Sequence, residues 1–362
     1  MILKKIKYIA VLTLIATSAL AGNRDRSGQS GAGELLFNPW TRSSGMFGLN
    51  GSYVSGIEAM KLNVAGLAKT ERTDVGIAHT RYLSGTGMSI SNVGLAQNLG
   101  DVGVLGVNIM SFGFGEIPIT TETSPEGGIG NYKPSFLNFS VGLGHSFSKN
   151  MSAGVSATFV SEAISNITAS AIAFDAGVQY TNGKRDNLHI GIALRNIGSN
   201  LRFSGDGFSF NGTSPDFAKQ LTVQSRSEKA SLPSQLNIAA SYDFYLDENK
   251  AGESEKPQHR LSAMASFVSN AFNNDWLGAG LEYAFKEKFM LRAAYRYENG
   301  IMEKQKSTTL YTGISAGVSF QTKLSNAEKA HAIAFEYAFK PTNIAGGVHV
   351  LGIKMSLAKQ SN

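Results

Sequence analysis

Apolar and small or polar residues alternate along most of the chain, in segments of about ten residues that end in turns. The clearest segment spans residues 276–285, in which Leu277 and Leu281 fall on one face and Gly280 and Glu282 on the other. Side chains of a β-strand point alternately to its two faces. The pattern therefore predicts strands with one bulky apolar face and one face that is small or charged.

The number and length of these segments distinguish a membrane barrel from a soluble sandwich. Strands of about ten residues match a tilted crossing of the hydrocarbon layer, whereas soluble strands cluster around five or six residues. An even number of strands is typical of bacterial outer-membrane barrels. We therefore predict an all-β fold, an antiparallel transmembrane β-barrel of about fourteen strands. The segments begin near Asp74, Met88, Gly100, Phe136, Met151, Ala171, Leu188, Ser234, His259, Trp276, Phe289, Thr308, Lys329 and Gly347.

Two further patterns are typical of such a barrel. Aromatic residues stand at segment ends, where a girdle at the lipid headgroups would place them. Long connections, at Ser111–Ser135 and Ile197–Pro233, follow odd-numbered segments. Short turns, at Leu99–Gly100, Ser148–Asn150 and Lys286–Lys288, follow even-numbered ones. With both termini in the periplasm, the long connections would lie outside the cell and the short turns on the periplasmic side. The charged stretch Phe244–Gln258 is an exception, because it is long but would lie on the periplasmic side. We interpret it as a solvated loop.

The beginning of the chain has the features of a secretory signal. Lys4, Lys5 and Lys7 precede the apolar run Ile9–Leu20, and Ala19-Leu20-Ala21 has the small residues that a signal peptidase requires. A membrane anchor is the weaker interpretation, because the run has about a dozen residues and a spanning helix needs about 20. We expect residues 1–21 to be a signal peptide, residues 22–73 a separate N-terminal segment and residues 74–358 the barrel.

Composition narrows the class of protein. The chain has no Cys, which excludes disulfides and thiolate metal sites. Charged residues make up 17%, below the roughly 25% of soluble domains, as suits a sheet with one face in lipid. The net charge of +6 includes the three signal-peptide lysines and does not indicate a nucleic-acid partner. No cofactor or metal motif is present, and the expected surroundings are outer-membrane lipid and lipopolysaccharide.

The N-terminal segment contains three stretches that resemble a known family: Glu34–Met46, Gly56–Met60 and Asn63–Ala68. They resemble the PorV/PorQ family of Bacteroidetes outer-membrane proteins, which is similar to the fourteen-stranded fatty-acid-transporter barrels. The corresponding family segment reads Asn-Pro-Ala-Gly-Leu-Ala, and Val64 here replaces the proline. At the level of strand pattern the resemblance covers nearly the whole chain after the signal.

This resemblance implies that the N-terminal segment folds into the barrel lumen as a plug or hatch. Small residues allow close backbone packing in the stretch that contains Ala65, Gly66 and Leu67. Asn63 can hydrogen-bond to the neighbouring backbone as an Asx turn. The alternative is that these residues only shape the turn into the first strand. Both interpretations give them a structural role.

Ionisable residues on the inward register would line the lumen. Charges of both signs in such a place form a network of salt bridges more often than a selectivity filter, because an unpaired charge there is costly. Either arrangement is compatible with the sequence. These residues are His189, Arg195, Glu282, Arg292, Arg296, Glu336 and Lys354.

Catalysis has little support, and we expect that the protein is not an enzyme. His79, His145, His331 and His349 fall on the outward register, and no nucleophile motif or zinc-protease motif occurs. The glycine-rich stretches at residues 127–130 and 205–207 lack the strand-to-helix context of a phosphate loop and are interpreted as turns.

Two functions remain open. The family resemblance implies an accessory barrel of the type IX secretion system that binds exported cargo or partner subunits in protein transport. The other is a plugged channel for hydrophobic small molecules, as in fatty-acid-transporter barrels. The long connections suit either function. An apolar run such as Phe208-Ser209-Phe210 offers a surface for cargo or for lipid.

Overall fold

The computed structural model describes residues 24–213, 220–247, 257–303, 307–324 and 331–357. The expected signal peptide, residues 1–21, and the strand start expected at Lys329 lie outside these described residues.

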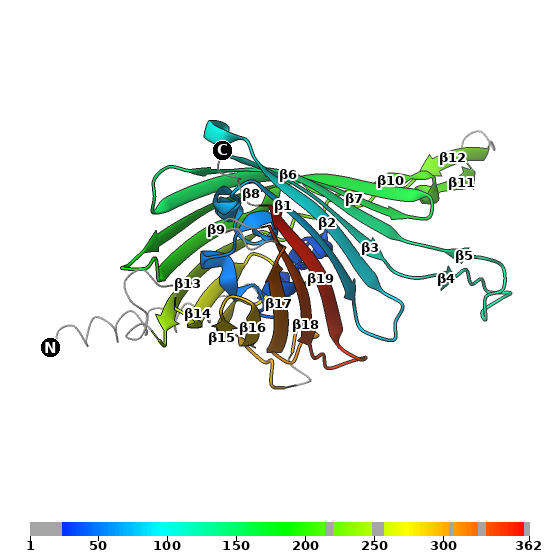
Figure 1. Ribbon diagram of the computed structural model, residues 1–362. Coiled ribbons are helices and arrows are strands. Elements are labelled where there is room, and N and C mark those ends of the chain that lie inside the picture. Colours follow the sequence, from blue (N-terminus) through cyan, green and yellow to red (C-terminus); the bar gives the residue numbers. More distant parts are fainter. Residues whose placement is uncertain (1–23, 214–219, 248–256, 304–306, 325–330, 358–362) are drawn as a thin grey trace.

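Within them, fourteen antiparallel strands close into a barrel, as predicted (Figure 1). Each strand pairs with its neighbour along the chain, and β1 closes the ring by pairing with β19. Closure leaves no exposed sheet edge, so every strand backbone can be satisfied inside a membrane. The ring consists of β1 (Thr73–Arg81), β2 (Ser89–Asn98), β3 (Val104–Gly113), β6 (Ser135–Ser146), β7 (Met151–Ile164), β8 (Ile167–Asn182), β9 (Leu188–Gly198), β13 (Gln235–Tyr245), β14 (His259–Asn270), β15 (Trp276–Phe285), β16 (Phe289–Glu298), β17 (Ile314–Lys323), β18 (Ala332–Lys340) and β19 (Val348–Leu357).

Most strands begin within a few residues of the expected positions, and the largest difference is instructive. The strand expected from Thr308 begins only at Ile314, because Thr308 and its neighbours form a loop. Gly313 separates the two with φ +91°, a left-handed conformation that interrupts an extended strand. Residues Gly100–Val102, where another strand was expected to start, form the short 3-10 helix η6.

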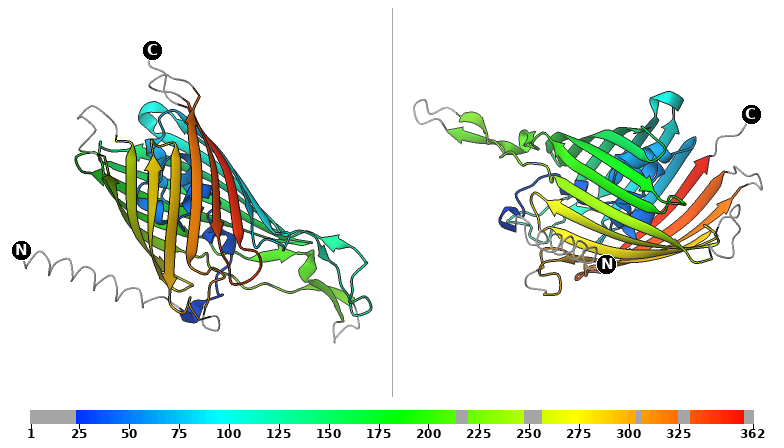
Figure 2. Two further views of the ribbon diagram at one scale, coloured as in Figure 1. Left: turned by 60° about the horizontal axis from the view of Figure 1, so that its bottom comes forward. Right: turned by 90° about the vertical axis from the view of Figure 1, so that its left-hand side faces the viewer.

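The two ends of the barrel differ, and we call them the long-loop end and the short-turn end. The long-loop end carries the hairpin of β4 (Ile117–Pro118) with β5 (Asn131–Tyr132) and that of β11 (Ser209–Thr213) with β12 (Gln220–Gln224). Both project away from the ring on the same side (Figures 1 and 2). β7 and β8 also extend toward this end, as strands of 14 and 16 residues. A tight turn joins them, so this connection is long because its strands are long and not because of a loop. β10 (Phe203–Gly205) pairs with the first residues of β8, and η7 (Asp206–Phe208) follows β10.

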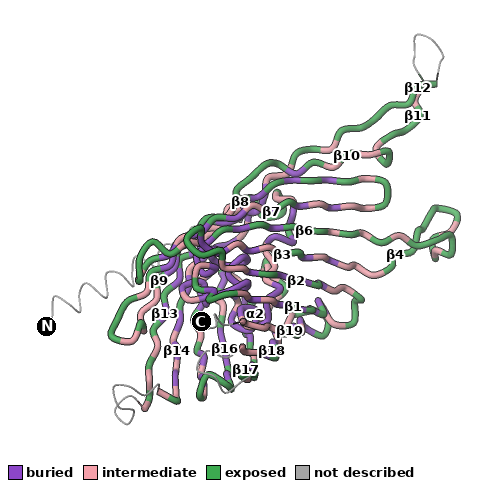
Figure 3. The backbone as a smooth tube through the Cα atoms, turned by 45° about the horizontal axis from the view of Figure 1, so that its top comes forward, coloured by how far each residue is buried: buried purple, intermediate pink, exposed green. Residues whose placement is uncertain are grey.

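The two faces of the barrel wall have the alternation that the sequence predicted. Buried and exposed residues alternate along each strand (Figure 3). Leu281 and Val155, on opposite sides of the ring, are 52% and 59% exposed on the outward face. In the described part of the chain, no helix has the length and apolarity needed to span a membrane.

The interior holds most of residues 32–70, which precede the first strand, whereas residues 25–29 are exposed at the barrel end (Figure 2). Their apolar side chains form a core with the wall, in which Ile57, Met60 and Leu67 pack with Ala96 and Val104. The short helices of this segment are η1 (Arg24–Arg26), η2 (Gly33–Leu36), α2 (Thr41–Ser44), η3 (Leu49–Ser52), η4 (Gly56–Lys61) and η5 (Val64–Lys69).

Candidate functional site in the barrel lumen

One side of the lumen is lined by glycines, and we call it the glycine wall: Gly94, Gly106, Gly142, Gly154, Gly177 and Gly191, on β2 to β9. A Cβ atom added to Gly154 would lie 2.6 Å from the backbone of Val64, and one on Gly177 would lie 2.1 Å from Asn63 Oδ1. Atoms cannot approach so closely. Only glycine therefore lets the N-terminal segment lie directly against the backbone of the sheet.

Asn63 ties the segment to this wall. Its Oδ1 accepts from the backbone N–H of Ala65 at 3.2 Å, as an Asx turn does, and its Nδ2 donates to the Val178 carbonyl of β8 at 3.0 Å. Gly66 is needed within the segment, because a Cβ there would lie 2.0 Å from the carbonyl oxygen of Val54. Ala65 and Leu67 are fully buried.

The opposite side carries ionisable residues, and we call it the charged wall: Asp243, Arg260, Glu282, Arg292, Glu336 and Lys354, on β13 to β19. Its centre is Glu282, whose side chain is 0% exposed. Arg42 of α2 donates to both Glu282 oxygens, at 2.6 Å from Nη2 and 3.1 Å from Nε. The wall adds Arg292 Nε at 3.2 Å and Arg260 Nη2 at 3.3 Å. One carboxylate on β15 thus joins the N-terminal segment to two further strands, β14 and β16.

The network extends from Glu282 in two directions. Arg292 donates to Ser319 Oγ at 2.7 Å, and Ser319 donates to Glu336 at 3.2 Å. On the other side, Arg260 Nη1 lies 3.7 Å from Asp243, which His189 Nε2 approaches at 3.4 Å.

Lys354 forms a separate contact with the N-terminal segment. Its Nζ donates to the carbonyl of Ser55 at 3.3 Å and lies 3.9 Å from Asp74. Five of the seven residues singled out in the sequence therefore stand on or beside the charged wall: His189, Glu282, Arg292, Glu336 and Lys354.

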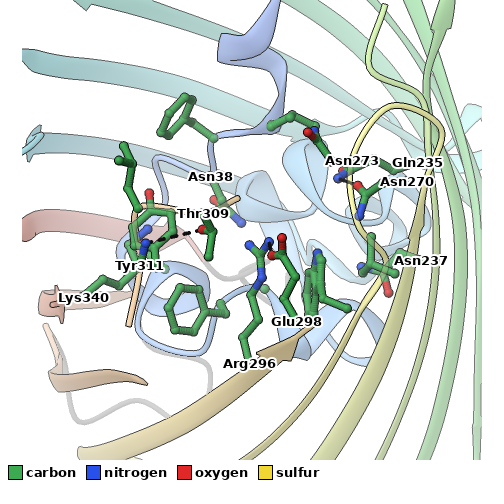
Figure 4. Close-up of a pocket in the computed structure, with 18 of the residues that line it drawn as sticks. Asn38, Gln235, Asn237, Asn270, Asn273, Arg296, Glu298, Thr309, Tyr311 and Lys340 are labelled. Carbon is green, nitrogen blue, oxygen red and sulfur yellow. Dashed lines mark hydrogen bonds and ion pairs between the residues drawn. The ribbon is translucent and has the colours of Figure 1, made fainter. Parts of the chain in front are cut away.

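The other two, Arg195 and Arg296, line a cavity of about 280 Å³ at the long-loop end. Figure 4 shows this cavity between the N-terminal segment, represented by Asn38, and the ends of several wall strands. Arg296 pairs with Glu298 at 2.5 Å and its guanidinium lies 4.8 Å from the ring of Trp276. The structure thus separates the predicted set into a locking network and a cavity lining.

Three cations with a large part in the lumen were not singled out in the sequence. Arg260 and Lys340 occupy the same register as inward neighbours on their strands, so alternation alone would have found them. Arg42 belongs to the irregular N-terminal segment, where no periodicity indicates the direction of a side chain. Among the described residues, no group of three or more His, Asp or Glu side chains is placed to hold a metal ion.

Glu34, in η2, is an unusual carboxyl of the N-terminal segment. It is 4% exposed, and its carboxyl lies within hydrogen-bonding reach of the Glu162 carboxyl on β7. Burial raises the pKa of Glu34 to about 8, and the nearby Glu162 carboxyl contributes to the increase.

Solved structures share this fold. The toluene transporter TodX of Pseudomonas putida superposes with a TM-score of 0.53 and 12% identity, over 89% of this chain and 100% of TodX. A FadL homologue of Pseudomonas aeruginosa has a TM-score of 0.47 and 12% identity, over 87% of this chain and 96% of that one. At 12% identity, the likeness to TodX concerns the fold alone. Among curated proteins, none matches the sequence significantly.

A family model identifies the chain more specifically. The model described as type IX secretion system membrane protein PorP/SprF matches residues 129–339, which is more than half of the chain. The PorV/PorQ name suggested by the N-terminal stretches is not confirmed, but the secretion system it implies is the same. The protein is accordingly an outer-membrane β-barrel, and it belongs to the PorP/SprF family of type IX secretion system membrane proteins.

Proposed function

We propose that this protein is a non-enzymatic accessory barrel of the secretion system, which docks exported cargo or a partner subunit at its long-loop end, as PorV-like proteins do. The family match is the observation that carries this proposal. The two projecting hairpins supply a suitable surface. They carry exposed apolar side chains beyond the ring of the barrel, at Ile119, Ile129, Phe210, Leu221 and Val223.

The proposal assigns a plug role to residues 22–73, after a signal peptide of residues 1–21 and before a barrel of residues 74–358. The bond between Arg42 and Glu282 and the contacts along the glycine wall favour a segment that stays in the lumen. A filled lumen suits a docking protein, since such a protein needs a rigid surface and no open pore.

Photo-crosslinking tests the docking surface. A benzoylphenylalanine at Phe210 or Ile129 should capture a secretion subunit or exported cargo in intact cells. The matched control is Phe289, which is equally exposed but lies on the lipid face near the short-turn end. Capture that is as strong at Phe289 as at the hairpins, or absent from both, would contradict the proposal.

A plugged channel for hydrophobic small molecules is the second candidate. The likeness to the TodX toluene transporter and the cavity at the long-loop end favour it. Uptake of toluene into vesicles that contain the purified protein would support this function. In planar bilayers, deletion of residues 34–67 should increase ion conductance, and equal conductance of the two proteins would contradict the plug role.

A further inference from the structure

The cavity at the long-loop end is lined by two cations, Lys340 and Arg195, that no carboxylate of the described residues contacts directly. Lys340 and Arg195 are each 7% exposed, and no described carboxylate lies within 4.0 Å of either charged group. The carboxylate of Asp175 interacts with Arg195 only from beyond that distance. Lys340 Nζ instead lies 5.2 Å from the ring centre of Tyr311, and Arg195 donates to the amide oxygen of Gln235 at 3.3 Å. A buried charge without a counter-ion is costly, so a protein retains one where a ligand supplies the opposite charge.

The hydrogen-bonding groups of the lining also favour a ligand with negative charge. Asn38 Nδ2, Arg195 Nε and Arg296 Nε are buried donors without a partner among the described residues. Polar groups buried in this way are rare and call for an explanation.

The carboxylate of the lining, by contrast, is already occupied. Arg296 donates to one oxygen of Glu298 at 2.5 Å, and Thr308 donates to the other at 2.5 Å. Asn270 Oδ1 likewise accepts from Gln235 at 2.6 Å. The cavity therefore has spare donors and spare positive charge, and a complementary ligand must bring acceptors and negative charge.

We propose that this cavity binds a carboxylate carried on an apolar group. Cationic and amide donors form charge-assisted hydrogen bonds with a carboxylate. The rings of Phe37, Tyr82 and Trp276 line the same space and would contact the apolar group. Phosphate, which is polar on every side, would leave these rings without a contact. The volume of about 280 Å³ lies near the lower end for small-molecule sites, roughly 300 to 1,000 Å³.

Such a carboxylate could come from the C-terminus of a peptide or from a free organic acid. A peptide C-terminus would belong to a docked cargo protein or partner subunit, as in the docking function proposed above. A free organic acid would be a solute of the proposed channel. The inference itself requires neither function. Loss of crosslinking with intact carboxylate binding would reject the docking role alone.

Trp276 offers a direct readout, because the chain has two Trp residues and the other, Trp40, can be replaced by Phe. Titration of the full-length Trp40→Phe protein in detergent would follow Trp276 fluorescence, with calorimetry on the wild type as a second measurement. The probes are N-acetylphenylalanine and a short peptide that ends in phenylalanine, each as free acid and as amide, with inorganic phosphate as a competitor. The acids should bind about tenfold or more tightly than the amides, since the charge-assisted bonds are lost in the amides.

Lys340→Gln and Arg195→Gln should each weaken binding of the acids about tenfold. Lys149→Gln, at the exposed turn between β6 and β7, is the matched control and should leave binding unchanged. The Lys340→Gln barrel should also unfold at a higher temperature without ligand, because it lacks the unpaired charge. If one variant does not fold, as judged by heat-dependent gel mobility, the other decides.

Tighter binding of the peptide acid identifies a chain terminus as the source, and tighter binding of N-acetylphenylalanine identifies a free acid. Equal binding of acids and amides, displacement by phosphate at equal concentration, or unchanged affinity in the folded variants would overturn the proposal.

Discussion

The glycine wall and the charged wall hold the same N-terminal segment by opposite means. On the glycine wall, the absence of side chains brings two backbones together, so that Asn63 reaches the Val178 carbonyl. On the charged wall, long side chains bridge the gap from strand to segment, as Arg42 and Glu282 do. The first contact depends on shape and the second on charge. Their outward faces are alike, because both meet the same lipid.

The largest effect should come from Glu282→Ala on the charged wall. Its loss leaves Arg42 and Arg292 without their common carboxylate, and removal of one partner from a buried ion pair costs about 3 to 5 kcal/mol. Unfolding in urea, with the protein in detergent, measures the change. Glu287→Ala is the matched control, since Glu287 also pairs with Arg260 but is 53% exposed, and such pairs contribute about 0 to 1 kcal/mol. Equal decreases in the free energy of unfolding for the two variants would show that burial does not distinguish the two carboxylates.

The next effect concerns the outward faces, where the two walls should behave alike. Leu281→Arg on the charged wall and Val155→Arg on the glycine wall should each destabilise the barrel by about 2 to 4 kcal/mol if the sites lie near the bilayer midplane. Folding into lipid vesicles over a denaturant series gives both values. If only one arginine is harmful, one of these faces does not meet lipid.

A smaller loss is expected for Gly154→Val on the glycine wall. The new side chain would collide with the backbone of Val64, and overpacking of this kind costs about 1 to 3 kcal/mol. Limited proteolysis should then cut the N-terminal segment faster. Gly33→Ala, whose Cβ would meet no atom within 4 Å, serves as the control and should be cut at the wild-type rate. Unchanged protection of Gly154→Val would mean that the segment is held by the charged wall alone.

The smallest effect should be a pH dependence due to Glu34. Its pKa in the folded protein, about 8, lies above its ordinary value, so protonation favours the folded state. The stabilisation is complete at pH values below that ordinary value and is lost as the pH rises toward about 8. Local opening of residues 32–37 would limit the global change to about 1 kcal/mol or less. Unfolding temperatures between about pH 5 and about pH 9 should fall for the wild type and stay level for Glu34→Gln; parallel curves would exclude Glu34 as the cause.

The sequence by itself determined the barrel, because the period of two that separates lipid-facing from lumen-facing residues is a property of each strand alone. It therefore indicated the strands, their number and the inward direction of Glu282 and Arg292. The alternation failed at Thr308, where a short polar stretch has the same pattern as a strand but Gly313 breaks the extension.

Only the tertiary structure decided which inward residues meet. Arg42 and Glu282 are separated by 240 positions, and no local pattern encodes a pairing over that distance. Lys340 shows the same limit of the sequence. Its inward direction can be read from the alternation along its strand, but its neighbours cannot. Lys340 faces a cavity whose described carboxylate, Glu298, already pairs with Arg296, and that arrangement depends on segments from the whole ring, because a charge is paired or unpaired only by what the fold brings beside it.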